Sequence, residues 1–120
     1  MTKSESIKNL SLALANFQKE VGKVDRNSKG YNYRYASLEN VLDTIREPLL
    51  KSGLIFSQLP DGNYGLTTIL IHPESGEYIE TTSEIVPTKD DPQGRGSAIT
   101  YNRRYHLVSM LGLTVEDDDG

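Results

Sequence analysis

The segment Leu54–Val86, LIFSQLPDGNYGLTTILIHPESGEYIETTSEIV, decides the fold class of this chain. Runs of apolar and β-branched residues alternate there with two turn signals, Pro60–Asn63 and Pro73–Gly76, and such short connections join antiparallel neighbours. Along the last run every second side chain is apolar or small, so one face of the sheet should pack against helices while the other meets water or a neighbouring subunit. The strands of this three-stranded antiparallel β-meander are expected at Leu54–Leu59, Tyr64–His72 and Tyr78–Val86.

Two helices are predicted before the meander. Apolar residues recur every three or four positions over about Ser6–Val21, and Gly22 is a natural stop. Ser37 has the chemistry of an N-cap for a second helix, which ends near Gly53. Pro48 is expected to kink that helix or end it early, because proline removes a backbone donor and clashes with the preceding turn.

After the meander, the sequence predicts a loop over Pro87–Gly96 and a final helix over about Ser97–Leu111. Ser97 is the expected N-cap of that helix, because its hydroxyl can accept from a backbone N–H of the first turn. The expected fold class is therefore α+β: a β-β-β-α core, in which a three-stranded antiparallel meander is followed by a helix, preceded by two N-terminal helices.

The composition fits one compact domain over residues 1–120. Hydrophobic residues make up 36% of the chain, which allows a modest core. No apolar run approaches the roughly 20 residues that span a bilayer, and the N-terminus lacks the apolar stretch of a signal peptide, so we expect a cytoplasmic protein without a membrane partner. The absence of cysteine excludes disulfides, thiolate metal sites and a cysteine nucleophile in this chain.

The net charge of −4 argues against a uniformly basic nucleic-acid binder, but the charge is unevenly distributed. Basic residues outnumber acids over residues 1–36, and acids dominate residues 37–91. Residues 92–115 then hold three arginines and no acid before the acidic run Glu116–Asp119. A protein arranged this way can present a local positive groove while its other faces repel a polyanion.

Two segments combine basic residues with tyrosines. Gln93–Tyr105 contains glycines, three arginines and two tyrosines, which supply close backbone approach, phosphate-binding charge and stacking surface for a single-stranded nucleic acid. Lys23–Tyr35 interleaves four basic residues with three tyrosines. It is either a hairpin arm or edge strand whose tyrosines pack on the domain, or an arm that stacks on bases and contacts phosphates. The main candidates for DNA contact are Lys89, Arg95, Tyr101, Arg103, Arg104 and Tyr105, and the second-tier candidates are Lys29, Tyr33, Arg34 and Tyr35.

The helical period assigns directions to these side chains. At about 100° per residue, Tyr101 and Tyr105 fall opposite the main apolar stripe of the final helix. Arg103 and Arg104 differ by one helical step and cannot both point at the same phosphate, so one is expected to bind the strand and the other a carboxylate in the fold or at a subunit contact. Arg95, in the predicted loop with Lys89, would take a phosphate near the positive end of the helix dipole.

Four motifs in order along the chain carry a resemblance to a known family: YRYASLE at Tyr33–Glu39, GSAITYNRRY at Gly96–Tyr105, LGL at Leu111–Leu113 and DDDG at Asp117–Gly120. With them, nearly the whole chain resembles the Erf (essential recombination function) family of phage single-strand annealing proteins. The final helix motif of that family commonly reads Thr-Tyr-Ala-Arg-Arg-Tyr, and this chain has Asn102 in place of the alanine. That substitution lies on the tyrosine face.

The resemblance implies an ATP-independent protein, encoded by a phage or prophage and acting in the bacterial cytoplasm. Such a protein coats single-stranded DNA as a homo-oligomer, often a ring or a helical filament, and promotes pairing of complementary strands. It needs no catalytic residue, metal or nucleotide cofactor. Members of the family usually continue past the Asp run, so the chain is expected to be an annealing core with an acidic tail over residues 113–120.

Other classes of function remain open from the residues. Glu116–Asp119 could offer oxygen ligands to Mg²⁺ in a nuclease, although a terminal acidic run is more simply a solvated tail. Ser97 and His106 permit a hydrolase triad on paper, but no nucleophile-elbow sequence surrounds the serine. Gly94-Arg95-Gly96 lacks the remaining residues of a nucleotide-binding fingerprint. A purely structural oligomerisation domain would explain the tyrosines and leave the arginines without a role.

Overall fold

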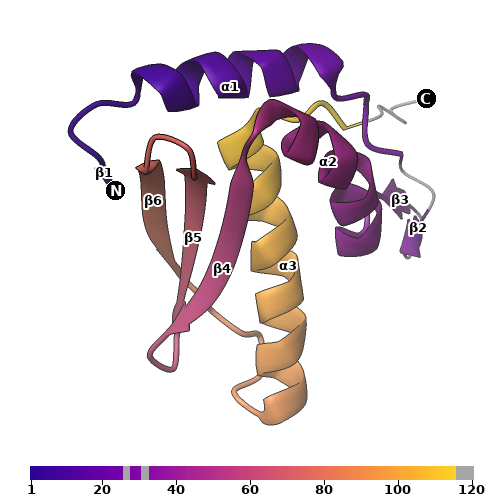
Figure 1. Ribbon diagram of the computed structural model, residues 1–120. Coiled ribbons are helices and arrows are strands. Elements are labelled where there is room, and N and C mark those ends of the chain that lie inside the picture. The colour runs from indigo at the N-terminus through magenta and orange to yellow at the C-terminus, as the bar shows by residue number, and fades with distance from the viewer. Residues whose placement is uncertain (26–27, 31–32, 116–120) are drawn as a thin grey trace.

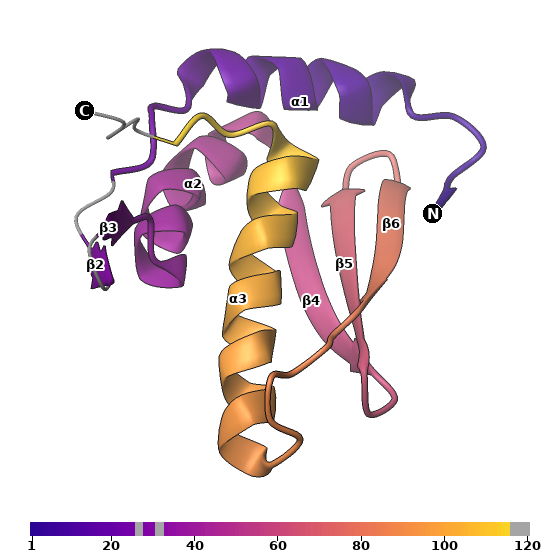
Figure 2. The same ribbon diagram turned by 180° about the vertical axis from the view of Figure 1, so that it is seen from behind.

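The computed structural model describes residues 1–25, 28–30 and 33–115, with the backbone alone for 28–30 and 33–35. It is an α+β fold (Figures 1 and 2). The elements in chain order are β1 (Thr2–Lys3), α1 (Lys8–Glu20), β2 (Ser28–Gly30), β3 (Tyr33–Tyr35), α2 (Leu38–Ser52), β4 (Ile55–Asp61), β5 (Gly65–His72), β6 (Glu77–Glu84) and α3 (Pro92–Leu111).

The predicted meander is confirmed, and the sheet has one more strand than expected. Strands β4, β5 and β6 pair antiparallel in sequence, and β1 adds to the free edge of β6, giving the order β1-β6-β5-β4. A strand of two residues, Thr2–Lys3, is too short to leave a periodic pattern in the sequence. Pro60 and Asp61 belong to β4 rather than to the turn. A proline is tolerated there because β4 is an edge strand, which needs no backbone donor on its outer side.

The core lies between one face of the sheet and the three helices of the described residues. Alternate residues of β5 are buried, as the period of two requires, and Leu70 faces helix residues that are also fully buried. In Figure 1, α1 crosses the end of the sheet at the β5–β6 turn. Figure 2 shows the molecule from behind, and there α3 lies in front of the sheet. The fully buried apolar residues include Leu10, Phe17, Val41, Ile45, Leu54, Leu70, Leu107 and Leu111.

Helix α1 is capped from the sheet rather than by its own sequence. Ile7, at its N-cap position, offers no side-chain hydrogen bond. Instead the carboxylate of Glu77 on β6 accepts from the backbone N–H of Leu10 at 2.8 Å and from Nδ2 of Asn9 at 2.9 Å. The bond from the Leu10 N–H is the main reason that the pKa of Glu77, only 8% exposed, lies below its ordinary value. A negative charge at a helix N-terminus is also favoured by the helix dipole.

The expectation that Pro48 ends the second helix early is wrong, and the alternative of a kink stays a prediction. Ser37 caps α2 as predicted, accepting from Asn40 N at 3.1 Å, but the helix continues through Pro48 to Ser52. Interior proline costs a helix about 3 kcal/mol. Ile45 and Leu49 are buried on either side of it, and the packing of two such side chains is large enough to offset that cost. The helix ends where predicted, with Gly53 in the left-handed region at φ 76°.

The predicted start of the last helix is also wrong, by five residues. Helix α3 begins at Pro92, and its N-cap is Asp91, whose carboxylate accepts from Gly94 N at 2.7 Å. Aspartate at the N-cap followed by proline at the first helical position is a strong signal for a helix start. Gly94 and Gly96 argue against a helix at this point, because glycine is a poor helix former. Ser97 is therefore inside the helix, and Gly94 to Gly96 are helical rather than a loop.

Candidate nucleic-acid interface

Tyr101 and Tyr105 form an exposed aromatic pair on α3. They are 55% and 56% exposed, and their ring centroids lie 6.0 Å apart with planes inclined by 15°. Their spacing of four residues places them one above the other on one helix face. The prediction that both stand away from the core stripe is confirmed.

Arg104 joins this aromatic pair to the segment that precedes α2. Its guanidinium carbon lies 5.3 Å from the centroid of the Tyr101 ring, within cation–π range. Its Nη1 donates to the backbone oxygen of Ala36 at 3.1 Å, and Ala36 directly follows the last strand of the β2–β3 hairpin. Arg104 thus links α3 to the residue that directly follows the segment Lys23–Tyr35.

Arg103 points to a different element, as the one-step divergence predicts. Its Nε donates to Oε1 of Gln58 on β4 at 3.0 Å, and Nε2 of Gln58 donates to the Arg103 backbone oxygen at 3.2 Å. The same amide also donates to the hydroxyl of Thr68 at 3.0 Å. Arg103 therefore binds an amide on the core side of the sheet rather than the expected carboxylate, and its half-buried side chain fastens α3 to β4.

Arg95 lies in the helix and is already paired. Its Nε donates to Oδ1 of Asp90 at 2.7 Å, and Oδ2 of Asp90 accepts from the Tyr64 hydroxyl at 2.7 Å. The hydrogen bond from Arg95 is the main cause of the lowered pKa of Asp90, and the bond to Asp90 is the main cause of the raised pKa values of Arg95 and Tyr64. No local pattern points to Tyr64 or Asp90, because they meet Arg95 only when the β4–β5 turn and the β6–α3 loop come together.

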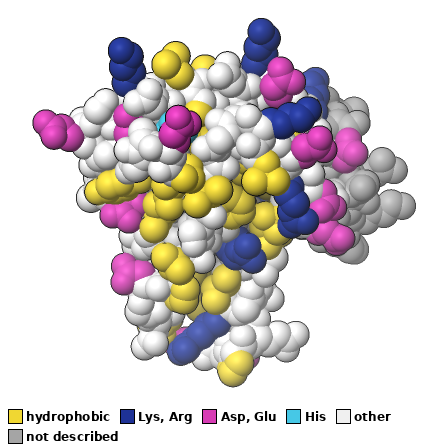
Figure 3. All heavy atoms as spheres, viewed as in Figure 1, with side chains coloured by type: hydrophobic (Ala, Val, Ile, Leu, Met, Phe, Trp, Pro, Cys, Tyr) yellow, Lys and Arg dark blue, Asp and Glu magenta, His cyan; other side chains and the backbone are white. Residues whose placement is uncertain are grey.

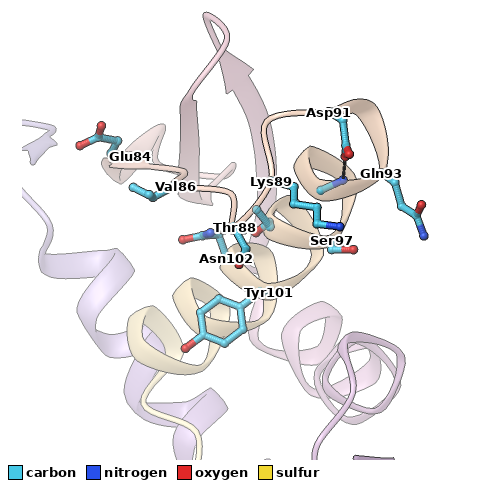
Figure 4. Close-up of a pocket in the computed structure, with 11 residues that line it drawn as sticks. Glu84, Val86, Thr88, Lys89, Asp91, Gln93, Ser97, Tyr101 and Asn102 are labelled. Atoms are coloured by element: carbon cyan, nitrogen blue, oxygen red, sulfur yellow. Dashed lines mark hydrogen bonds between the residues drawn. The ribbon is translucent and has the colours of Figure 1, made fainter.

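Lys89 lines a cleft of about 770 Å³ between the β6–α3 loop and the first half of α3 (Figure 4). In the figure its side chain extends over Ser97, with Tyr101 further along the same helix. Lys89 is the cation among the lining residues, and Glu84 and Asp91 are the acids. The cleft is thus mixed in charge, and its remaining polar side chains are Thr88, Gln93, Ser97, Tyr101 and Asn102.

The second-tier candidates lie on the β2–β3 hairpin. The backbone pairing sets Lys29 opposite Arg34 and Gly30 opposite Tyr33, so this segment forms the hairpin that the sequence allowed. The structure describes only the backbone of Lys29, Tyr33, Arg34 and Tyr35. Tyr31 lies outside the described residues. Their contact with DNA stays a prediction.

The described residues give little support to the alternative functions. Ser97 and His106 are on one helix, separated by about 13 Å of helical rise, so they do not form a triad. Within the described ranges no group of three or more histidine and carboxylate side chains could hold a metal ion. The acidic run Glu116–Asp119, on which the nuclease depends, lies outside the described residues. No helix in the described part of the chain is both long and apolar enough to cross a membrane.

The fold and this surface define a small α+β protein that presents arginine and tyrosine side chains on one exposed helix face. The family model described as ERF superfamily matches residues 10–120, so the chain belongs to the ERF superfamily. This agrees with the resemblance seen in its motifs and makes a phage recombination or annealing protein its general class. Neither the curated proteins nor the solved structures include a match to this chain.

Proposed function

We propose that this chain is a single-stranded DNA-binding and annealing core that acts without ATP and as a homo-oligomer. The observation that carries the proposal is the exposed face of α3, where Arg104 lies against Tyr101 and the ring of Tyr105 stands one turn further. Tyrosine rings offer stacking surface to any base, and an arginine beside them can neutralise the backbone. Stacking leaves the Watson–Crick edges of the bases available to a complementary strand.

The strand is proposed to follow α3 rather than the meander. Strands β4, β5 and β6 contain no lysine or arginine, and Glu80 and Glu84 stand on the outer face of the sheet, where they would repel a phosphate backbone. From Arg95 to Tyr105 the helix rises about 15 Å. At the roughly 3.4 Å per nucleotide of one B-form strand, that length serves on the order of four nucleotides, so one copy provides only a short site.

Self-association would extend this short site by multivalency. The outer face of the sheet supports it, because no described helix covers that face and apolar side chains form a band across its strands (Figure 3). Ile55 and Leu59 of β4 are 45% and 48% exposed, and the register places Ile55 beside Ile71 and then Tyr78. A contiguous exposed apolar surface is typical of a protein interface, and the proposed occupant is a second copy of this chain.

A purely structural oligomerisation domain is the second candidate, and the same apolar band favours it. That function would leave the exposed aromatic and basic face of α3 without a role. The two candidates differ in whether substitutions on α3 change an affinity for DNA.

Replacing both Tyr101 and Tyr105 by alanine tests the proposal. Each stacked base contributes about 1–3 kcal/mol, so loss of even one stack should weaken binding of a labelled single strand by roughly fivefold or more. The matched control replaces both by phenylalanine, which keeps the rings and should keep the affinity. Because both side chains are more than half exposed, neither variant should unfold. Equal affinities of the alanine and phenylalanine variants in fluorescence anisotropy would contradict stacking on α3.

A further inference from the structure

Arg95, a main candidate for phosphate binding, is held by a carboxylate in the free protein. Asp90 accepts from both the Arg95 guanidinium and the Tyr64 hydroxyl, each at 2.7 Å. The hydroxyl lies 3.5 Å from Nη2 of Arg95, and the guanidinium carbon lies 5.4 Å from the Tyr64 ring centroid. The side chains of Arg95 and Asp90 are 43% and 55% exposed, so a ligand can approach them from solvent.

The donors around Asp90 are those that a phosphate would use. A guanidinium presents the same planar set of N–H groups to carboxylates and to phosphates, and a tyrosine hydroxyl donates to either. The three side chains come from different elements: Tyr64 from the β4–β5 turn, Asp90 from the β6–α3 loop and Arg95 from the first turns of α3. Two donors are thus aimed at one anionic position by the fold, and an aspartate of the chain itself fills that position.

We propose that Asp90 is an internal competitor of the DNA backbone, occupying the position at which Arg95 and Tyr64 receive a phosphate of the bound strand. This inference rests on the proposed function and adds a control of affinity to it. Strand binding exchanges the carboxylate for a phosphate, with no covalent bond made or broken. The exchange lowers the affinity at this point, which favours release of the strand once it has paired.

The decisive variant is Asp90→Asn, which removes the competing charge and keeps the size of the side chain. An exposed ion pair is worth at most about 1 kcal/mol, so removing the competing carboxylate should raise the affinity for a labelled thymidine single strand by roughly twofold to fivefold at low salt. The matched control is Asp43→Asn on α2, which makes the same change in net charge at an exposed position. The control should change the affinity by less than twofold, a general charge effect.

A double-mutant cycle connects the gain to Arg95. In a chain that already carries Arg95→Ala, adding Asp90→Asn should give no gain beyond the general charge effect seen in Asp43→Asn, because the phosphate donor is gone. Tyr64→Phe, added to Asp90→Asn, should remove part of the gain, because the hydroxyl that would donate to the phosphate is lost.

The outcomes separate this inference from the function on which it rests. Wild-type and Asp90→Asn chains that bind single strands equally well would overturn the inference and leave DNA binding standing. A gain of the same size in Asp43→Asn, or a gain that persists with Arg95→Ala, would also overturn it. If none of the chains binds a single strand at low salt, the proposed function itself fails and the inference fails with it.

Discussion

Replacing Gly94 by alanine should destabilise the domain, although alanine is the better helix former. Gly94 lies in the first turn of α3 and donates its N–H to Asp91. A Cβ atom there would overlap the backbone oxygen of Lys89 and would lie 3.1 Å from Oδ1 of Asp91. Either the β6–α3 loop or the first turn of the helix must shift to make room.

The magnitude follows from three contributions. Loss of an N-cap costs about 0.5–2 kcal/mol, forced overpacking costs about 1–3 kcal/mol, and replacing a helical glycine by alanine returns about 1 kcal/mol. The expected net loss is therefore about 0.5–4 kcal/mol. Gly96 is the matched control, because it is in the same helix and a Cβ there meets nothing within 4 Å; Gly96→Ala should stabilise the domain by about 0.5–1 kcal/mol.

Thermal unfolding of the two variants checks this reasoning. At roughly 4 °C per kcal/mol for a domain near this size, Gly94→Ala should lower the Tm by roughly 2–16 °C and Gly96→Ala should raise it by roughly 2–4 °C. If Gly94→Ala raised the Tm as much as Gly96→Ala does, the close contact with Lys89 and the helix start at Asp91 would both be wrong.

Three further predictions concern the cap of α1, the candidate nucleic-acid interface and the sheet. Glu77 has a lowered pKa in the fold, so the stability that its charge contributes is full above about pH 4.3 and is lost as the pH falls through the lower folded-state pKa; Tm measured from pH 6 to 3 should fall less in Glu77→Gln than in the unaltered chain. Arg104→Gln should flatten the salt dependence of single-strand binding by about 0.7 in log–log slope, whereas Arg46→Gln on α2 should not change it. Leu59→Glu on the outer face should reduce the mass of the sedimenting species without unfolding the domain, and an unchanged mass would contradict the proposed self-association. Leu70→Ala in the core should instead lower the free energy of unfolding in urea by about 2–5 kcal/mol.

Local patterns in the sequence were sufficient to predict most of the fold. The meander followed from turn signals at fixed spacing, and Ser37 and Gly53 marked the ends of α2 through cap chemistry that acts within a few residues. Pro48 was misjudged because a propensity of a few kcal/mol is overridden by burial on both sides of it. Strand β1 could not be foreseen, because its pairing with β6 joins residues far apart in sequence.

The candidate site was foreseen only in part, for a related reason. Helical period alone placed Tyr101 and Tyr105 on the exposed face and separated Arg103 from Arg104. The partners of the arginines depend on tertiary contacts: Gln58 is on β4 and Ala36 precedes α2. Asp90 falls within the predicted loop Pro87–Gly96, and its pairing with Arg95 depends on the earlier start of α3, which places Arg95 in the helix.

The measurement that tests the central claim most directly is strand pairing without ATP. Two complementary single strands, one carrying a fluorophore and the other a quencher, are mixed with and without this chain at low salt, in Mg²⁺ and in EDTA. The account predicts that the chain accelerates quenching in both conditions, leaves the strands intact on a gel, and loses the acceleration when Tyr101 and Tyr105 are both alanine. Pairing at the uncatalysed rate, or cleavage of the strands in Mg²⁺, would contradict it.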